Sequence, residues 1–225
     1  MSSQFIVDLF LYQRVIHLQG MTTNQTKQEA KNIASNLSTS TLHRSFYVNP
    51  RLLEYYNTQF SEKQVKRIDE NFYDYSLGTR FRLNVPVPRP PRRLRYLIQK
   101  SFSGDVSGDI GEALFAYFLV HEMQISRFLI GHTRPEKKRG FLSPDFIICA
   151  SSPNLTSFLQ KPVLPLPILG EVKGFTGSID AGRIYHALLQ LRRLILNQSL
   201  VGLLFLAMRN EARHGYDAYV VRVES

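Results

Sequence analysis

The sequence predicts an α/β fold in which a mixed central β-sheet is flanked by helices. Three observations lead to this class. Hydrophobic residues make up 44% of the 225 residues, which is enough for a packed core and excludes a disordered chain. The C-terminal half contains amphipathic helical patterns, and it contains strand-length apolar runs that alternate with them. One of these runs is almost wholly apolar, as expected for a strand that is buried on both faces.

In the first third of the chain, the spacing of apolar residues differs from one segment to the next. Residues 4–19 are apolar without a single period, so that strand and short helix stay open. Residues 22–38 predict a helix with Thr23, Asn24 or Thr26 as its cap and an apolar stripe made of Ala30, Ile33, Ala34 and Leu37. The Ser-x-x-Gln capping box at 61–64 predicts a second helix, with Val65, Ile68 and Phe72 on its buried side.

A proline-rich segment follows. Residues 84–93 contain four prolines, which fit neither a helix nor a central strand. We interpret this segment as an extended connector. It divides the chain into a basic, largely helical N-terminal region, residues 1–100, and a core, residues 101–225. The N-terminal region is a candidate extension for DNA recognition or dimerisation.

The core has a clear order of elements. Helix, three strands, helix and two strands are predicted at 107–123, 124–132, 144–150, 167–175, 178–198, 200–208 and 216–223. Residues 151–166 carry three prolines and predict a long loop. The helical patterns place two apolar sets inward: Leu114, Phe115, Phe118 and Leu119 in the first helix, and Ile184, Leu188, Leu191 and Ile195 in the second.

The charge of the chain favours a polyanionic partner. Formal net charge is +10, from 28 Lys and Arg against 18 Asp and Glu. Residues 1–100 hold 15 basic and 7 acidic residues, so most of the excess lies there. Nucleic acid is the first partner to expect, and an acidic membrane surface is the second.

Compartment follows from what the sequence lacks. The N-terminus has no basic segment before its apolar run, and no apolar run approaches the ~20 residues of a membrane span. We therefore expect an intracellular, cytoplasmic protein associated with the nucleoid. Cys149 is the single cysteine, which excludes an intrachain disulfide, and its apolar neighbours predict a buried, reduced thiol.

Acidic residues accompany two of the predicted strands. Glu171 and Lys173, in the stretch GEVKGF, are two residues apart and therefore share one face of a strand, and Asp145 precedes another apolar run. Carboxylates on interior strands are costly unless they bind a cation, and paired carboxylates suit Mg²⁺. Lys173 would then orient a water or neutralise developing charge. The alternative is an ion pair on an edge strand, in which Lys173 bridges the two acids.

The pairing of Pro144-Asp145 with Glu171-Val172-Lys173 resembles the signature of the PD-(D/E)XK nuclease superfamily. The resemblance covers about residues 105–210 and implies the restriction endonuclease-like core, in the order αβββαβ. It implies Asp145, Glu171 and Lys173 as catalytic residues and Mg²⁺ as the cofactor, with Mn²⁺ able to substitute. Its metal ligands would be Asp145, Glu171, the backbone carbonyl of Val172 and Glu112 on the first core helix.

Two observations bear on the metal ligands and on the branch of the superfamily that the resemblance implies. Asp105 and Asp109 compete with Glu112, which is alternatively an ordinary surface residue near a helix start. The recombination-exonuclease branch has a glutamine and a tyrosine four residues apart on the second helix. Here Gln190 is followed by Leu194, so the sequence does not support that branch.

Basic residues suggest where the nucleic acid binds. One face of the helix at 178–198 holds Arg183, His186, Gln190, Arg193 and Asn197. Of these, Gln190 is the expected substrate-positioning residue, and His186 is a possible proton carrier. Two further clusters contain Arg89, Arg92, Arg93, Arg95 and Lys100, and Arg134, Lys137, Lys138 and Arg139. The alternative for each set is a solvated basic surface.

These observations predict a Mg²⁺-dependent deoxyribonuclease. We expect an endonuclease, restriction-like or associated with defence, that acts as a homodimer or with a partner protein on DNA. The alternatives are a Holliday-junction resolvase, the nuclease subunit of a larger complex, and a non-catalytic nucleic-acid-binding subunit.

Overall fold

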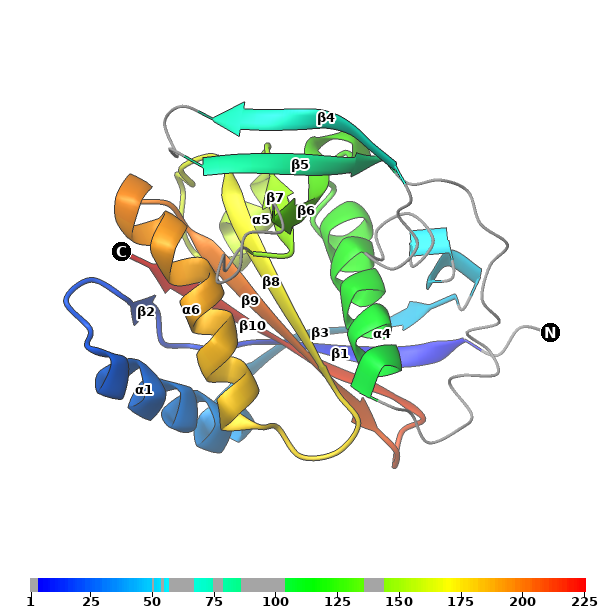
Figure 1. The fold of residues 1–225 in the computed structure, drawn as a ribbon. Coiled ribbons are helices and arrows are strands. Elements are labelled where there is room, and N and C mark those ends of the chain that lie inside the picture. The colour runs from blue at the N-terminus through cyan, green and yellow to red at the C-terminus, as the bar shows by residue number, and fades with distance from the viewer. Residues whose placement is uncertain are drawn as a thin grey trace.

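Strands from both ends of the chain form one sheet in the computed structural model. It describes residues 4–49, 51–53, 55–56, 67–74, 79–85, 104–135 and 144–225. Within these ranges, ten strands join in the order β3-β1-β10-β9-β8-β7-β6-β5-β4, and β2 pairs with the end of β10 (Figure 1). The strands are β1 (Phe5–Leu11), β2 (Ile16–His17), β3 (Thr41–Val48), β4 (Arg67–Asp74), β5 (Thr79–Val85), β6 (Ile130–Pro135), β7 (Phe146–Ile148), β8 (Ile168–Phe175), β9 (Gly202–Asn210) and β10 (Gly215–Glu224).

The sheet is mixed. β8 pairs with β9 in parallel and β1 pairs with β10 in parallel, whereas the pairs β7–β8, β6–β7, β9–β10 and β1–β3 are antiparallel. The parallel pair β8–β9 requires a crossover, and helix α6 (Ala181–Gln198) provides it. The α/β class with a mixed sheet flanked by helices is confirmed.

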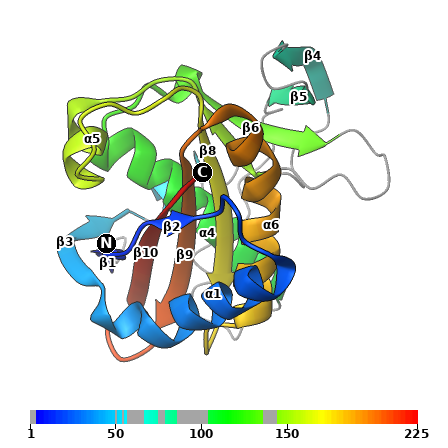
Figure 2. The ribbon, with the colours of Figure 1, turned by 90° about the vertical axis from the view of Figure 1, so that its left-hand side faces the viewer.

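Strand alternation divides the core into two layers. Leu203 and Phe205 of β9 lie in one hydrophobic cluster, and Leu204 and Leu206 lie in the other. The first layer contains α4 (Gly104–Tyr117), which continues into a π-helical turn, Phe118–Glu122. The second contains α1 (Thr23–Asn36) and α6, which lie side by side in both views (Figures 1 and 2). The predicted inward residues of both core helices are buried.

Two glycines allow α4 to approach β8 closely. A Cβ at Gly170 would lie 2.5 Å from a ring carbon of Phe115. A Cβ at Gly111 would lie 3.1 Å from Val172 and 3.3 Å from the backbone nitrogen of Gly174. Helix and strand therefore meet along the segment of β8 that carries Glu171 and Lys173.

The N-terminal part of the chain completes this sheet. Phe5, Val7 and Leu9 of β1 lie in the same cluster as α4. The expectation of a largely helical N-terminal region is wrong, because strands β1 to β5 accompany α1 in its described part. The expected boundary near residue 100 lies outside the described residues, as does nearly all of the proline-rich connector. The division into two functional parts stays a prediction.

Four local expectations are corrected. Val65 lies outside the described residues, but Ile68 and Phe72 belong to strand β4, where a helix was expected, because this segment pairs with β5. Thr22 caps α1, in a capping box with Gln25. Residues 151–166 contain a short helix, α5 (Pro153–Phe158). Cys149 is exposed, because β7 ends one residue earlier.

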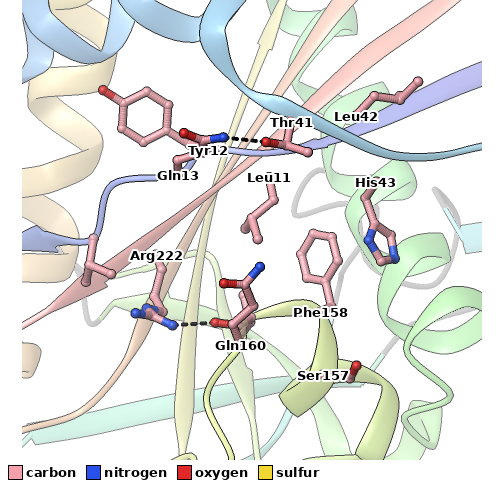
Figure 3. A pocket seen from close by; sticks show the side chains of 12 residues that line it. Leu11, Tyr12, Gln13, Thr41, Leu42, His43, Ser157, Phe158, Gln160 and Arg222 are labelled. Atoms are coloured by element: carbon pink, nitrogen blue, oxygen red, sulfur yellow. Dashed lines mark hydrogen bonds between the residues drawn. The ribbon is translucent and has the colours of Figure 1, made fainter.

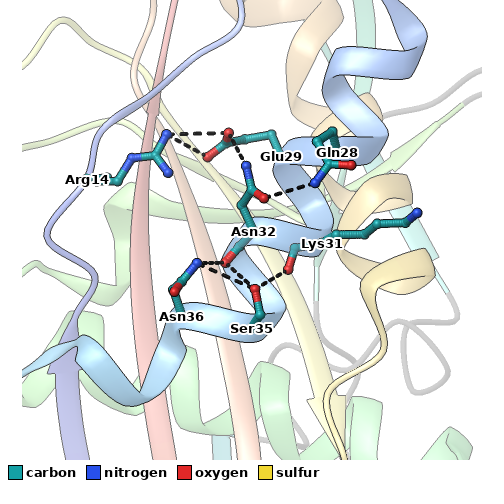
Figure 4. Close-up of polar contacts among 7 residues, drawn as sticks. All are labelled: Arg14, Gln28, Glu29, Lys31, Asn32, Ser35 and Asn36. Atoms are coloured by element: carbon teal, nitrogen blue, oxygen red, sulfur yellow. Dashed lines mark hydrogen bonds and ion pairs between the residues drawn. The ribbon is translucent and has the colours of Figure 1, made fainter.

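The connection between β1 and β2 is tied to α1 through Arg14. Its guanidinium lies 3.2 Å from Oε1 of Glu29, whose side chain is buried, and Asn32 donates a hydrogen bond to the same carboxylate (Figure 4). Since Glu29 belongs to α1, its contact with Arg14 fixes the helix against the end of β1.

Candidate active site

Asp145 and Glu171 meet at the beginning of β7. Phe146 pairs with Gly170, so the antiparallel register places Asp145 beside Glu171. The Asp145 amide donates a hydrogen bond to Oε2 of Glu171 at 3.2 Å, and the Val172 amide donates one to Oδ2 of Asp145 at 2.9 Å. Each carboxylate is therefore held by the backbone of the other strand.

Lys173 adds a cation to this pair. It lies on the same face of β8 as Glu171, two residues on, and its Nζ donates a hydrogen bond to Oε1 of Glu171. Nζ also donates a second hydrogen bond, at 3.3 Å, to Oε1 of Gln190 on α6. The expected set of Asp145, Glu171 and Lys173 is thus brought together, and Gln190 joins it through the lysine.

Burial decides the electrostatics of the site. The Glu171 side chain is 0% exposed and that of Lys173 is 17% exposed. Burial raises the pKa of Glu171 well above its ordinary value, and the neighbouring Asp145 charge adds to this, while Lys173 opposes it. Burial lowers the pKa of Lys173, but Glu171 and Asp145 outweigh it, so the net shift is upward and the lysine is charged.

Two residues of the polar face of α6, Arg183 and Gln190, lie beside β8. The Arg183 guanidinium lies 4.7 Å from the ring centroid of Phe175, at the end of β8. Its positive charge opposes the upward shift of the Lys173 pKa. Arg193, His186 and Asn197 are exposed. A nucleic-acid contact by Arg183, Gln190 or Arg193 stays a prediction, as does proton transfer by His186.

Glu112 lies on α4 and is half-buried. Its neighbour Gly111 packs on Val172 and Gly174, whereas Glu171 and Lys173 belong to the side of β8 that faces α6. Among the described residues, no group of three or more His, Cys, Asp or Glu side chains is arranged to hold a metal ion. Glu112 and the Val172 carbonyl as metal ligands stay predictions. Of the alternatives to Glu112, Asp109 is buried.

Nearly all residues of the two basic clusters lie outside the part of the chain that the structure describes. Arg89, Arg92, Arg93, Arg95 and Lys100 lie outside the described residues, and so do Lys137, Lys138 and Arg139. Arg134 belongs to β6, as its register with Arg82 of β5 shows. Their role toward a nucleic acid stays a prediction.

The carboxylate oxygens of the site suit Mg²⁺, but one of them already accepts a hydrogen bond from Lys173. Mg²⁺ prefers oxygen ligands and needs only one or two carboxylates, because it keeps several waters. Asp145 and Glu171 provide two adjacent carboxylates, but Oε1 of Glu171 already accepts a hydrogen bond from Lys173. A cation that binds Glu171 through Oε1 must therefore take the place of the Lys173 ammonium there.

One part of the site was not expected from the sequence. The reciprocal bonds between Asp145 and β8 use the backbone amides of Asp145 and Val172, and no side-chain pattern reports them. The contact between Gln190 and Lys173 also differs from the expected role of Gln190, which was substrate positioning. The helical spacing in α6 predicted that Gln190 lies on its polar face, but it did not predict the contact with Lys173.

No protein-family model, curated protein or solved structure matches this chain. No helix in the described ranges has the length and apolar character needed to cross a membrane.

Proposed function

We propose that the protein is a Mg²⁺-dependent deoxyribonuclease that cleaves DNA internally, with Asp145, Glu171 and Lys173 as its catalytic residues. Three observations support this proposal. The two carboxylates and the lysine lie together on β7 and β8. The helices and strands around them follow the order α4, β6, β7, α5, β8, α6, β9, which is compatible with an αβββαβ core that carries α5 as an insertion. The net charge of +10 suits a phosphodiester polymer.

The burial of Glu171 carries the proposal. A carboxylate that is 0% exposed is expensive to maintain, and a second carboxylate beside it adds repulsion. A core would be at least as stable with an apolar residue at this position. A site that must hold a cation and a phosphate gives a reason for both acids and for the lysine.

In the proposed reaction, Asp145 and Glu171 would hold Mg²⁺, which when bound lowers the pKa of water and offsets charge on the phosphate. The Lys173 ammonium would bind a phosphate oxygen and stabilise the charge that develops there. Gln190 would keep Nζ beside the carboxylates through its hydrogen bond. The backbone bonds of Asp145 and Val172 would fix both carboxylates before substrate arrives.

The test is a cleavage assay on plasmid, linear, single-stranded and branched DNA, with Mg²⁺, with Mn²⁺ and with EDTA. We expect cleavage that requires a divalent metal. Asp145→Asn and Lys173→Met should each lower it about a hundredfold or more, while DNA binding persists. Lys161→Met is the matched control, because Lys161 pairs with Glu224 and lies outside the site. Unchanged cleavage by Asp145→Asn or Lys173→Met would refute the assignment.

A non-catalytic nucleic-acid-binding subunit is the second candidate. The bond between Lys173 and Glu171 favours it, because this ion pair neutralises the buried carboxylate without any metal. Metal-independent DNA binding without cleavage of any of the four substrates would support it over the first.

A further inference from the structure

A cavity of about 370 Å³ lies on the α4 side of the sheet, away from the candidate active site. The end of β1, the start of β3, helix α5 and Arg222 of β10 surround it (Figure 3). Arg222 pairs with Leu203 on β9, which pairs with Gly170 on β8, so strand β9 separates the cavity wall on β10 from β8. Its volume is at the lower end of the range for small-molecule sites, about 300–1,000 Å³, which limits a ligand to one ring system and a charged group.

Aromatic and aliphatic side chains form part of the wall. Leu11 and Phe158 face the same space from β1 and α5. The His43 ring meets Phe158 edge to face, with ring centroids 4.7 Å apart. Burial lowers the pKa of His43, and Arg44 lowers it further, so the ring is uncharged at neutral pH. Two uncharged aromatic rings at right angles form a corner that suits a flat ring.

Carboxamides line the cavity beside these rings. Gln13 donates a hydrogen bond to Thr41 at 2.6 Å, which holds its amide in place, and Gln160 extends from the segment after α5. Amide groups offer both donors and acceptors. A purely aliphatic ligand would desolvate them without pairing them, which is unfavourable. A ring that carries nitrogen and oxygen atoms at its edge meets this requirement.

The charge around Arg222 is positive. Arg222 and Lys161 share one carboxylate, Glu224, at 3.3 Å and 2.7 Å. Arg222 also donates a hydrogen bond from Nη1 to the Leu159 carbonyl. Of these three residues only Arg222 lines the cavity, and Lys161 and Glu224 lie behind it, so the charge that the wall itself presents here is the Arg222 cation. The ligand that complements it is an anion.

We propose that this cavity binds a small anionic molecule with a flat heteroaromatic ring, of the size of a mononucleotide. The ring would pack in the corner of His43 and Phe158, its edge would pair with Gln13 and Gln160, and the anionic group would lie toward Arg222. The proposal stands independently of the nuclease activity.

The experiment is isothermal titration calorimetry of the full chain with AMP, GMP and UMP, in EDTA so that no divalent metal is present. At least one of them should bind with a dissociation constant below about 1 mM. Adenosine, which lacks the charge, and ribose 5-phosphate, which lacks the ring, should bind about tenfold more weakly. No binding of any mononucleotide, or equal binding of ribose 5-phosphate, overturns the proposal.

Variants locate the ligand. Arg222→Gln should weaken binding about tenfold. Gln160→Gly should weaken it about threefold, and glycine accepts the backbone φ of 52° found there without strain. Gln124→Gly is the matched control, because Gln124 is exposed, has φ of 55° and lies outside the cavity.

Lys173→Met separates this cavity from the candidate active site and should leave binding unchanged. Loss of binding in that variant, or no effect of Gln160→Gly relative to Gln124→Gly, overturns the assignment to the cavity. If Arg222→Gln does not fold, the two glycine variants decide the question alone.

Discussion

Lys173→Met tests how strongly the buried ion pair holds the site together. Methionine keeps the aliphatic stem of the lysine and removes the ammonium. Glu171, which is 0% exposed, then loses its cation and retains the Asp145 amide as a donor. Breaking a buried pair by removing one partner costs about 3–5 kcal/mol, because it leaves an uncompensated charge. We therefore expect the free energy of unfolding to fall by about 3 kcal/mol in metal-free buffer at pH 8.

The reverse variant, Glu171→Gln, should cost less. Lys173 is 17% exposed, and it keeps Gln190 as an acceptor 3.3 Å away, so its charge stays partly solvated. Two unit charges about 4 Å apart attract by about 4 kcal/mol at an effective dielectric constant of 20. We expect a coupling energy of about 3 kcal/mol between the two substitutions once local relaxation is included.

The assay is urea unfolding of the wild type, the two single variants and the double variant, all in EDTA. The control is the same cycle for Lys161→Met and Glu224→Gln, whose side chains are 29% and 18% exposed. This less buried pair should couple by about 1 kcal/mol or less. A coupling energy below about 0.5 kcal/mol for the buried pair would refute the reasoning, since it would mean that the lysine does not compensate Glu171.

The pH dependence of the Lys173→Met variant gives an independent check. In the folded wild type, burial and Asp145 raise the pKa of Glu171, and Lys173 lowers it, so the variant raises this pKa further. The folded variant then binds more protons than the unfolded chain, whose glutamates titrate near 4.3. Its stability therefore falls as pH rises from about 4.3 through the folded pKa, and returns on acidification. We expect a smaller difference from wild type at pH 5 than at pH 8.

Two further predictions concern packing and a second buried acid. Gly170→Ala should destabilise the fold by about 1–3 kcal/mol, because its Cβ would meet the aromatic layer at 2.5 Å. Gly108→Ala, on helix α4, where an added Cβ would have nothing within 4 Å, should stabilise the fold by about 0.5–1 kcal/mol. Similar thermal unfolding curves for both would contradict the packing argument. Arg213→Ala should cost about 1.5–3 kcal/mol, because Asp8 is 2% exposed and pairs with that arginine. In an Asp8→Asn background the loss should fall below about 1 kcal/mol, and an undiminished loss would show that Arg213 acts through another contact.

The core elements were predictable because each one has a strong local signal. The apolar stripe of α6 has a clear helical period, and Ile184, Leu188, Leu191 and Ile195 are all buried. β9 is apolar on both sides because α4 lies over one face and α6 over the other. Charged residues in such strands are conspicuous, which drew attention to Glu171 and Lys173, and the resemblance to the PD-(D/E)XK signature joined them with Asp145 into one predicted site.

What failed depended on pairing with another strand. Ile68 and Phe72 are spaced four apart, as on a helix, but the segment pairs with β5 and forms a strand. The apolar residues at 4–19 gave no period, because β1 lies inside the sheet and receives its environment from β10 and β3. Local propensity is a weak guide where such pairing decides the structure.

Lys173 explains why stability alone cannot separate the two candidate functions. Its Nζ bonds to Glu171 and lies 3.3 Å from Gln190, so the ammonium has two acceptors on two different elements. An ammonium with two acceptors can give up one and stay paired, which a lysine held only by Glu171 could not do. The arrangement is therefore compatible with a metal-free ion pair, and under the proposed function Lys173 would yield the carboxylate to a cation and keep its bond to Gln190. Both readings predict the same loss of stability in Lys173→Met, and only the catalytic reading predicts that Gln190→Ala slows cleavage in Mg²⁺ while DNA binding persists.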